Sequence, residues 1–219
     1  MIKVIIFGTG DNSQIANFFL SEDKNYEVVA FTIDSNYLKE EEFEGKPVIG
    51  FEKLSDFFSP DKYKLFIPVG YTDINQFREK KFLEGKSKGY EFITYISPRA
   101  SVASNAKIGE NCFILEDNTI QPYVNIEDNC VLWSGNHIGH HSTIEKNCFI
   151  SSHVVISGGC KVGRNSFLGV NATIRDHVLV GSHNIIGMGA NVTHDTNDYD
   201  VYIKGASKLS VKSSKEIKL

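Results

Sequence analysis

Aliphatic residues recur at every sixth position from Val102 to Val192 without a gap. An α-helix repeats every 3.6 residues or so and a β-strand about every two, so neither produces a period of six. This period suits one flat side and one tight corner of a parallel β-helix, with the branched residue pointing into the prism. The positions are Val102, Ile108, Ile114, Ile120, Ile126, Leu132, Ile138, Ile144, Ile150, Ile156, Val162, Leu168, Ile174, Val180, Ile186 and Val192.

The residue two places before each of these is small or modest in size, as the crowded interior near a corner requires. Three sides make one coil, so the segment predicts a little over five coils and a rod roughly 25 Å long. All four cysteines, Cys112, Cys130, Cys148 and Cys160, have this inward phase. Close pairs such as C-x₂-C are missing from the sequence, so we predict a reduced core ladder and no metal site.

The overall composition is that of an ordinary globular chain: 219 residues, 41% hydrophobic residues and a net charge of −4. No basic segment large enough to bind nucleic acid is found. The apolar run at the start, MIKVIIFGTG, is short and ends in glycines, which predicts neither a signal peptide nor a membrane span. We therefore expect a cytoplasmic location.

The first hundred residues alternate between strands and helices. Strands are expected at 2–7, 26–33, 65–69 and 92–96, and helices at 14–20 and around 74–88. This alternation predicts an α/β domain with a parallel sheet, Rossmann-like in outline. The expected organisation is a nucleotide-binding domain at 1–97, the β-helix at 98–195 and a tail at 196–219.

Two loops follow strands of this domain and could meet one ligand. Gly8 and Gly10 would let backbone amides approach a phosphate, and Asp34 could accept a hydrogen bond from a ribose hydroxyl. Ser13 replaces the third glycine of G-x-G-x-x-G, which disfavours a nicotinamide cofactor, while another nucleotide or a purely structural turn both stay open. The second loop contains Gly70 and Tyr71. Arg78 beyond it could reach a phosphate or simply be solvated.

The α/β domain, the joint YISPRASVASNAKIG and the corner Ile138-Gly139-His140 together resemble the NeuD/PglD-like bacterial sugar acyltransferases. The resemblance implies left-handed coiling and a homotrimer. It also implies transfer of acetyl from acetyl-CoA to an amino group of a nucleotide-linked sugar in surface-glycan synthesis, with the thioester between two rods. His140 is then the general base, and a group titrating near neutrality suits deprotonation of an attacking amine.

The chain departs from these relatives in three places. His141 follows His140 where a carboxylate is usual, so the partner that orients the base is open. Trp133 stands where relatives often carry asparagine, and it should reshape the sugar pocket or cap an apolar part of the rod. The terminal G-x-P-A-K appears as Gly205-Ala206-Ser207-Lys208, without the proline.

The remaining expectations concern the cofactor and the other classes of function. Gly158, Gly169 and Gly187 are candidates for backbone contact with the pantetheine arm, against the alternative that they serve only the corners. Lys208 is a candidate for the CoA phosphates, against a solvated tail. O-acetylation of a similar sugar is the alternative enzyme reaction. A noncatalytic or γ-carbonic-anhydrase-like trimer is the alternative class, for which the histidine spacing supplies no convincing zinc set.

Overall fold

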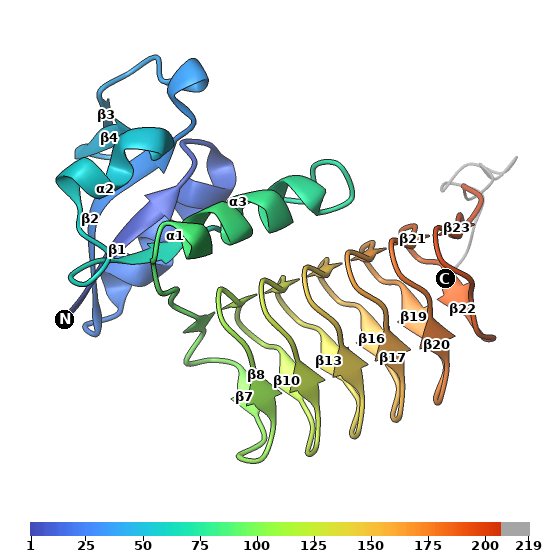
Figure 1. Cartoon of the computed structure of the whole chain (residues 1–219). Coiled ribbons are helices and arrows are strands. Elements are labelled where there is room, and N and C mark those ends of the chain that lie inside the picture. The colour runs from blue at the N-terminus through green and yellow to red at the C-terminus, as the bar shows by residue number, and fades with distance from the viewer. Residues whose placement is uncertain (207–219) are drawn as a thin grey trace, which may run out of the picture.

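The computed structural model describes residues 1–206. Figure 1 shows an α/β domain, coloured blue to green, beside a rod of stacked coils that runs from green to red. Helix α3 (Gln76–Ser87) belongs to the domain and lies alongside the rod. No helix within residues 1–206 is both long and apolar enough to cross a membrane.

The domain is built on one mostly parallel sheet, in the order β3-β4-β2-β1-β5. Strand β1 lies inside this sheet, and its residues from Val4 to Phe7 are buried, as expected for a continuous apolar run in a covered parallel sheet. The strands are β1 (Ile2–Phe7), β2 (Tyr26–Ile33), β3 (Glu42–Phe43), β4 (Lys46–Gly50) and β5 (Lys64–Phe66). The helices are α1 (Asp11–Glu22), α2 (Leu54–Phe57) and α3, with 3₁₀ turns η1 (Ser35–Tyr37) and η2 (Phe51–Lys53).

The first two predicted strands are confirmed at their exact bounds, and the third is shorter than predicted because it ends at Phe66. The segment expected as a strand at 92–96 is divided between the two parts of the molecule. Phe92 forms a single bridge with Leu65, whereas β6 (Tyr95–Ile96) pairs with β9 of the rod. The chain therefore leaves the domain directly into the first stacked sheet. The antiparallel β3–β4 pair was not predicted.

The rod has three faces, each a sheet of short parallel strands one coil apart. The first sheet holds β6, β9 (Phe113–Ile114), β12 (Val131–Leu132), β15 (Phe149–Ile150), β18 (Phe167–Leu168), β21 (Ile185–Ile186) and β23 (Val201–Tyr202). The second holds β7 (Ser101–Val102), β10 (Thr119–Ile120), β13 (His137–Ile138), β16 (Val155–Ile156), β19 (Thr173–Ile174) and β22 (Asn191–Val192). The third holds β8 (Lys107–Ile108), β11 (Asn125–Ile126), β14 (Thr143–Ile144), β17 (Lys161–Val162) and β20 (Leu179–Val180). This stack confirms the parallel β-helix and matches its left-handed form.

The inward ladder is confirmed by the register: Ile138 pairs with Ile120 on one side and Ile156 on the other. The four cysteines are buried and free in the same core. Burial raises the pKa of Cys112 and Cys130 well above the ordinary thiol value, so these thiols stay protonated and unreactive.

The three sheets meet at three corners, which we name by order. The first corner follows strands of the first sheet and includes Trp133, the second follows the second sheet and includes His140, and the third follows the third sheet and includes Asn147. In most coils one residue of each corner has a positive φ, which turns the chain sharply. These residues include Asn111, Asp117, Tyr123, Asn129, Gly135, His141, Asn147, His153, Gly159, Asn165, Asn171, His177, His183 and Gly189.

The domain covers the first sheet of the rod. Outward side chains of that sheet, Phe113, Val131 and Phe149, join one buried cluster with Val4 and Phe66 of the domain. The outward position of a rod strand would otherwise be polar, so this apolar column marks the docking face.

Candidate functional site

His140 lies at the second corner, exposed to solvent, between β13 and β14. Its backbone is held from both sides: its N–H donates to Oε1 of Gln121 at 2.9 Å, and its carbonyl accepts from the N–H of Gly159 at 2.8 Å. Its Nδ1 lies 3.2 Å from Nδ1 of His141. The adjacent imidazole is therefore the side-chain partner of His140, and the two rings stand edge to face, 5.3 Å between centroids.

The ring of His141 is itself fixed, because it stacks on Tyr123 of the preceding coil at 4.6 Å between centroids. The ring of His140 leans the other way, over Gly158 of the following coil. A Cβ built on Gly158 would lie 2.6 Å from Cε1 and 2.7 Å from Nε2 of His140. The absence of a side chain at Gly158 is thus what leaves room for the imidazole.

Four of the histidines lie at the corner position that has a positive φ, and His140 does not. His141, His153, His177 and His183 all have φ of 58–59°, a conformation in which Asn, Asp and His are enriched. His140 comes one residue before that position and carries no such backbone requirement. Corner geometry therefore accounts for four of the seven histidines and leaves His137, His140 and His194 without this explanation.

A cavity of about 540 Å³ opens at the carboxyl ends of β1 and β2, where both predicted nucleotide loops meet. Gly8 has φ of +106°, and a Cβ there would lie 2.5 Å from Oγ of Ser13, so the residue that replaces the third glycine packs directly on the first. Gly10 is the N-cap of α1 and is open to the cavity. The lining residues are Phe7, Gly8, Gly10, Asp11, Asn12, Ser13, Ile33, Asp34, Tyr37, Val69, Gly70 and Phe77.

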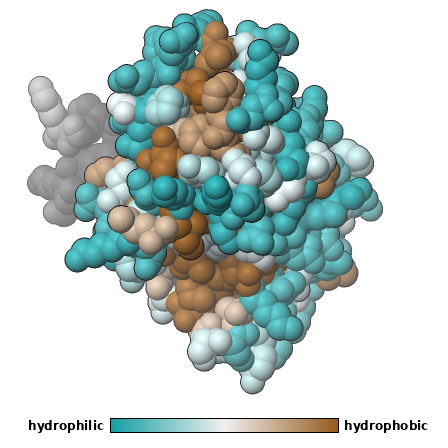
Figure 2. Space-filling model, turned by 60° about the vertical axis from the view of Figure 1, so that its left-hand side comes forward, coloured by the Kyte–Doolittle hydropathy of each residue, from teal (hydrophilic) through white to brown (hydrophobic). Residues whose placement is uncertain are grey.

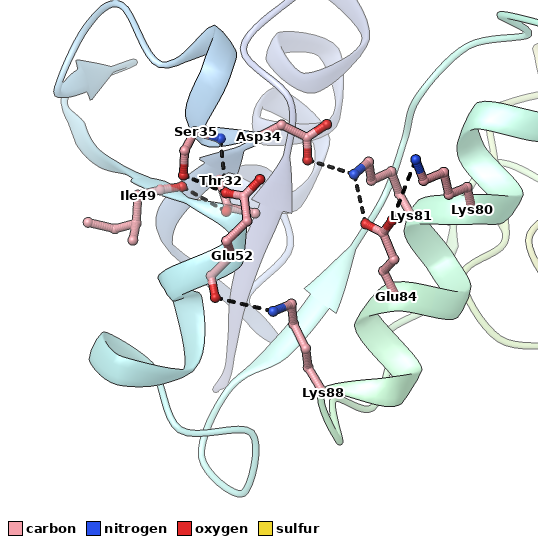
Figure 3. A network of polar contacts seen from close by, with 9 residues as sticks. All are labelled: Thr32, Asp34, Ser35, Ile49, Glu52, Lys80, Lys81, Glu84 and Lys88. Carbon is pink, nitrogen blue, oxygen red and sulfur yellow. Dashed lines mark hydrogen bonds and ion pairs between the residues drawn. The ribbon is translucent and has the colours of Figure 1, made fainter.

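Asp34 lies in the wall of this cavity with a partner of its own. Figure 3 shows its carboxylate pointing to Lys81 of α3, and Oδ1 accepts from Nζ at 2.6 Å. Lys81 also donates to Oε2 of Glu84 at 2.7 Å. Burial alone would lower the pKa of Lys81, but these hydrogen bonds to Asp34 and Glu84 raise it above the ordinary lysine value. The ammonium therefore stays charged and holds Asp34 in one orientation.

A second cavity, of about 640 Å³, adjoins the first and reaches the rod. Asn12 and Gly70 line both cavities, and the second adds Tyr71 and Trp133. Tyr71 packs on Phe149 and Phe167, with ring centroids 5.0 and 4.6 Å apart. The lining residues are Asn12, Gly70, Tyr71, Thr72, Trp133, Phe149, Ser151, Ser152 and Val170. The structure thus gathers five predicted ligand-binding residues, Gly8, Gly10, Asp34, Gly70 and Tyr71, with Trp133 around two joined cavities.

The predicted cofactor residues do not lie together on one chain. Gly158 is at the second corner under His140, whereas Gly169 and Gly187 stack one coil apart at the first corner. A Cβ on Gly169 would lie 2.7 Å from the backbone nitrogen of Met188, so this glycine lets two coils approach. Lys208 lies outside the described residues 1–206.

Arg78 neither reaches a cavity nor meets solvent, so both sequence interpretations of it are wrong. Its side chain is fully buried between α3 and the third corner of the rod.

Sequence reasoning also missed Asn12, Tyr37, Phe77 and the pair Ser151 and Ser152 as cavity residues, because only the folded arrangement brings them to the walls.

A family model described as the GMPPB C-terminal domain matches residues 92–197. No curated protein sequence matches the chain. Among residues 1–206, no three His, Cys, Asp or Glu side chains lie close enough together to hold a metal ion.

Two solved structures show the same fold over nearly the whole chain. PerB from Caulobacter crescentus, in complex with CoA and GDP-perosamine, is 24% identical with a TM-score of 0.81, covering 91% of this chain and 92% of PerB. The acetyltransferase domain of PglB from Neisseria gonorrhoeae is 23% identical with a TM-score of 0.79, covering 88% of this chain and 92% of that domain. The same domain has also been solved with acetyl coenzyme A, at 22% identity and a TM-score of 0.81.

Proposed function

We propose that this chain, which shares its fold with those two acetyltransferases, is an acetyl-CoA-dependent N-acetyltransferase. Its acceptor is the amino group of a nucleotide-linked amino-deoxy sugar, and its role is in bacterial surface-glycan synthesis in the cytoplasm. One observation carries the proposal: His140 stands exposed at a rod corner, with a second imidazole at its Nδ1, on a fold whose solved relatives hold CoA and GDP-perosamine.

The cavity in the Rossmann-like domain is assigned to the nucleotide. Gly10 is the N-cap of α1, and the free N–H groups of a helix N-terminus suit a phosphate. Asp34 is oriented by Lys81 and offers its second oxygen to a ribose hydroxyl. The adjoining cavity between Tyr71 and Trp133 is assigned to the sugar, since aromatic faces suit the apolar face of a pyranose ring.

The two histidines supply the proton chemistry. In the tautomer that leaves Nε2 of His140 free, Nδ1–H of His140 donates to Nδ1 of His141. The sugar amine attacks the thioester carbonyl carbon, Nε2 of His140 takes the proton that the nitrogen loses, and the C–S bond breaks as the tetrahedral intermediate collapses. The proton then passes to the departing CoA thiolate, which leaves as the thiol.

The site requires a neighbouring chain. Trp133 and the sugar cavity are at the first corner, whereas His140 is at the second corner, with the whole second sheet between them. The outward residues of the named strands of that sheet include no carboxylate, lysine or arginine: Ser101, Thr119, His137, Val155, Thr173 and Asn191. Val155 of this sheet is exposed. Figure 2 shows that hydrophobic surface also reaches the outside of the molecule between hydrophilic flanks. These features support the homotrimer, in which His140 of one chain meets the cavity of the next.

We expect light scattering at micromolar concentration to give three times the mass of one chain. A sharper readout is complementation: His140→Ala and Gly70→Trp should each be inactive alone, the second because the indole would project from a residue that lines both cavities and obstruct ligand binding there. Mixed after reversible dissociation, they should regain activity, since some sites then combine an intact His140 with an intact cavity. A monomer, or mixtures as inactive as the parents, would contradict a shared site.

The function is tested by thiol release from acetyl-CoA against UDP-, GDP- and dTDP-linked sugars carrying a 3-amino or 4-amino group, with the matching hydroxy sugars as controls. We expect turnover with one amino sugar and none with its hydroxy counterpart. Turnover of the hydroxy sugar alone would establish O-acetylation, and no turnover across the panel would contradict the assignment.

Asp34→Asn should raise KM for the nucleotide sugar by about tenfold or more, because a hydrogen bond from a ligand to a charged group is lost. KM for acetyl-CoA should hardly change. Glu84→Gln is the matched control: it also removes one carboxylate from Lys81, but Glu84 does not line the nucleotide cavity. Equal effects of the two substitutions would show that Asp34 acts only through Lys81.

A further inference from the structure

Arg78 is a buried cation whose hydrogen-bond partners are all uncharged. Its Nε donates to the carbonyl of Asn129 at 3.2 Å, and Nη2 donates to the carbonyls of Asn147 at 2.8 Å and Cys148 at 3.2 Å. These three acceptors belong to two successive coils at the third corner of the rod. One side chain of the domain therefore bridges two successive coils of the rod.

The other end of the same guanidinium holds a loop of the domain. Nη1 of Arg78 donates to the carbonyls of Val69 at 3.1 Å and Gly70 at 2.8 Å, and to Oδ1 of Asn75 at 3.0 Å. Gly70 lines both cavities. The guanidinium thus connects the cavity loop directly to the rod. Burial lowers the pKa of Arg78 to about 10, so it is still charged at neutral pH.

The loop between these contacts has an unfavourable backbone. Asp73, Ile74 and Asn75 have consecutive positive φ angles of 53, 47 and 65°, and one of them is β-branched. Three such residues in a row persist only where surrounding contacts enforce them. Tyr71, which forms part of the wall of the sugar cavity, lies two residues before this strained segment.

Asn75 supplies the second part of the restraint. It is the N-cap of α3, yet its side chain makes no capping hydrogen bond. Its Nδ2 donates instead to the carbonyls of Asn165 at 3.0 Å and Ser166 at 3.2 Å on the rod. Asn75 is fully buried. Its side chain therefore makes hydrogen bonds to the rod in place of the local hydrogen bond that an N-cap residue usually makes to its own helix.

We propose that Arg78 and Asn75 are positioning residues that hold the strained loop against the rod and thereby set the width of the sugar cavity between Tyr71 and Trp133. This inference rests on the proposed function for its kinetic part only. Its structural part concerns Tyr71, Trp133 and the loop, and can be measured in the protein without any substrate.

The probe for the structural part is intrinsic fluorescence, because Trp133 is the one tryptophan of the chain and lines the cavity. Arg78→Lys removes the planar guanidinium, which makes hydrogen bonds to the rod and to the loop at the same time. The cavity should then widen, and acrylamide quenching of Trp133 should rise by about twofold. Asn75→Gly is the second variant, for use if Arg78→Lys does not fold. It keeps the left-handed backbone but loses the hydrogen bonds to the rod, and it should also raise the quenching of Trp133. Arg99→Lys, at an exposed pair with Asp117, is the control that leaves quenching unchanged.

The kinetic readout separates positioning from general destabilisation. In a variant with native circular dichroism, we expect KM for the nucleotide sugar to rise about tenfold while KM for acetyl-CoA stays within twofold. Folded variants with wild-type quenching and wild-type KM would overturn the proposal. If the wild-type chain acetylates no sugar, yet Arg78→Lys still raises quenching, the loop restraint stands and the proposed function fails.

Discussion

Replacing His140 with alanine is expected to lower kcat by about 10²–10⁴-fold, the usual contribution of a general base. KM for acetyl-CoA and the trimer mass should stay close to wild type, because the ring is exposed and its backbone bonds to Gln121 and Gly159 do not need the side chain. Positioning of amine and thioester should sustain the residual rate. Steady-state kinetics across the pH range measure the loss.

The role of His141 is tested by His141→Asn, which tolerates the left-handed backbone at φ 59°. We expect a smaller loss of kcat than for His140→Ala, since the asparagine carbonyl can still accept from Nδ1 of His140. His177→Asn is the control, with the same φ at the same corner two coils later. If His140→Ala keeps near-wild-type kcat while His141→Asn does not, the base must be reassigned.

Gly158→Ala is expected to reduce kcat by about 10²-fold with little loss of stability. The added methyl group would lie 2.6 Å from Cε1 of His140, and an exposed imidazole can swing aside to relieve the contact. A misplaced base loses much of its catalytic effect. A rise in KM for acetyl-CoA with unchanged kcat would instead support the interpretation of Gly158 as a backbone contact for the cofactor.

Gly139→Ala provides the contrasting case. A Cβ there would lie 2.5 Å from the backbone nitrogen of Gly158, and backbone atoms of adjacent coils cannot swing away. This variant should lower the melting temperature of the protein, whereas Gly158→Ala should not. Thermal unfolding followed by circular dichroism distinguishes them. Equal melting temperatures would show that the coils separate more easily than their close contact indicates.

The rod was predictable because its signal is strictly local and repeated: each coil needs an inward aliphatic residue at the same phase, as Ile120, Ile138 and Ile156 illustrate. The cavity loops were predictable for a similar reason, since strands such as β1 and β2 end where a parallel sheet presents its carboxyl edge. Handedness and the role of His140 came from resemblance.

The junction of domain and rod could not be predicted. On the rod, Arg78 donates to backbone carbonyls, which carry no sequence signature, and these partners are 51 to 70 positions away along the chain. The asparagines of the third corner did offer a signal, because they recur at an interval of 18 residues through four successive coils. Their side chains form a continuous series of hydrogen bonds, and a search for polar periodicity would have found Asn111, Asn129, Asn147 and Asn165.

That series of asparagines begins at the backbone of Ile67 and ends at Oε2 of Glu79, so both of its ends belong to the domain. The domain therefore holds both ends of the coils that this series spans, whereas within residues 1–206 no hydrogen bond joins the strands from β19 to β23 to the domain. In a linear array of repeats, stability is approximately a sum of terms between neighbouring repeats. The end that has no additional contacts therefore unfolds first. Unfolding should therefore proceed along the rod from its carboxyl end and stop at the coil of Asn165. The domain thus stabilises the earlier coils from the side of the rod, whereas repeat arrays commonly obtain such stabilisation from a modified repeat at one end.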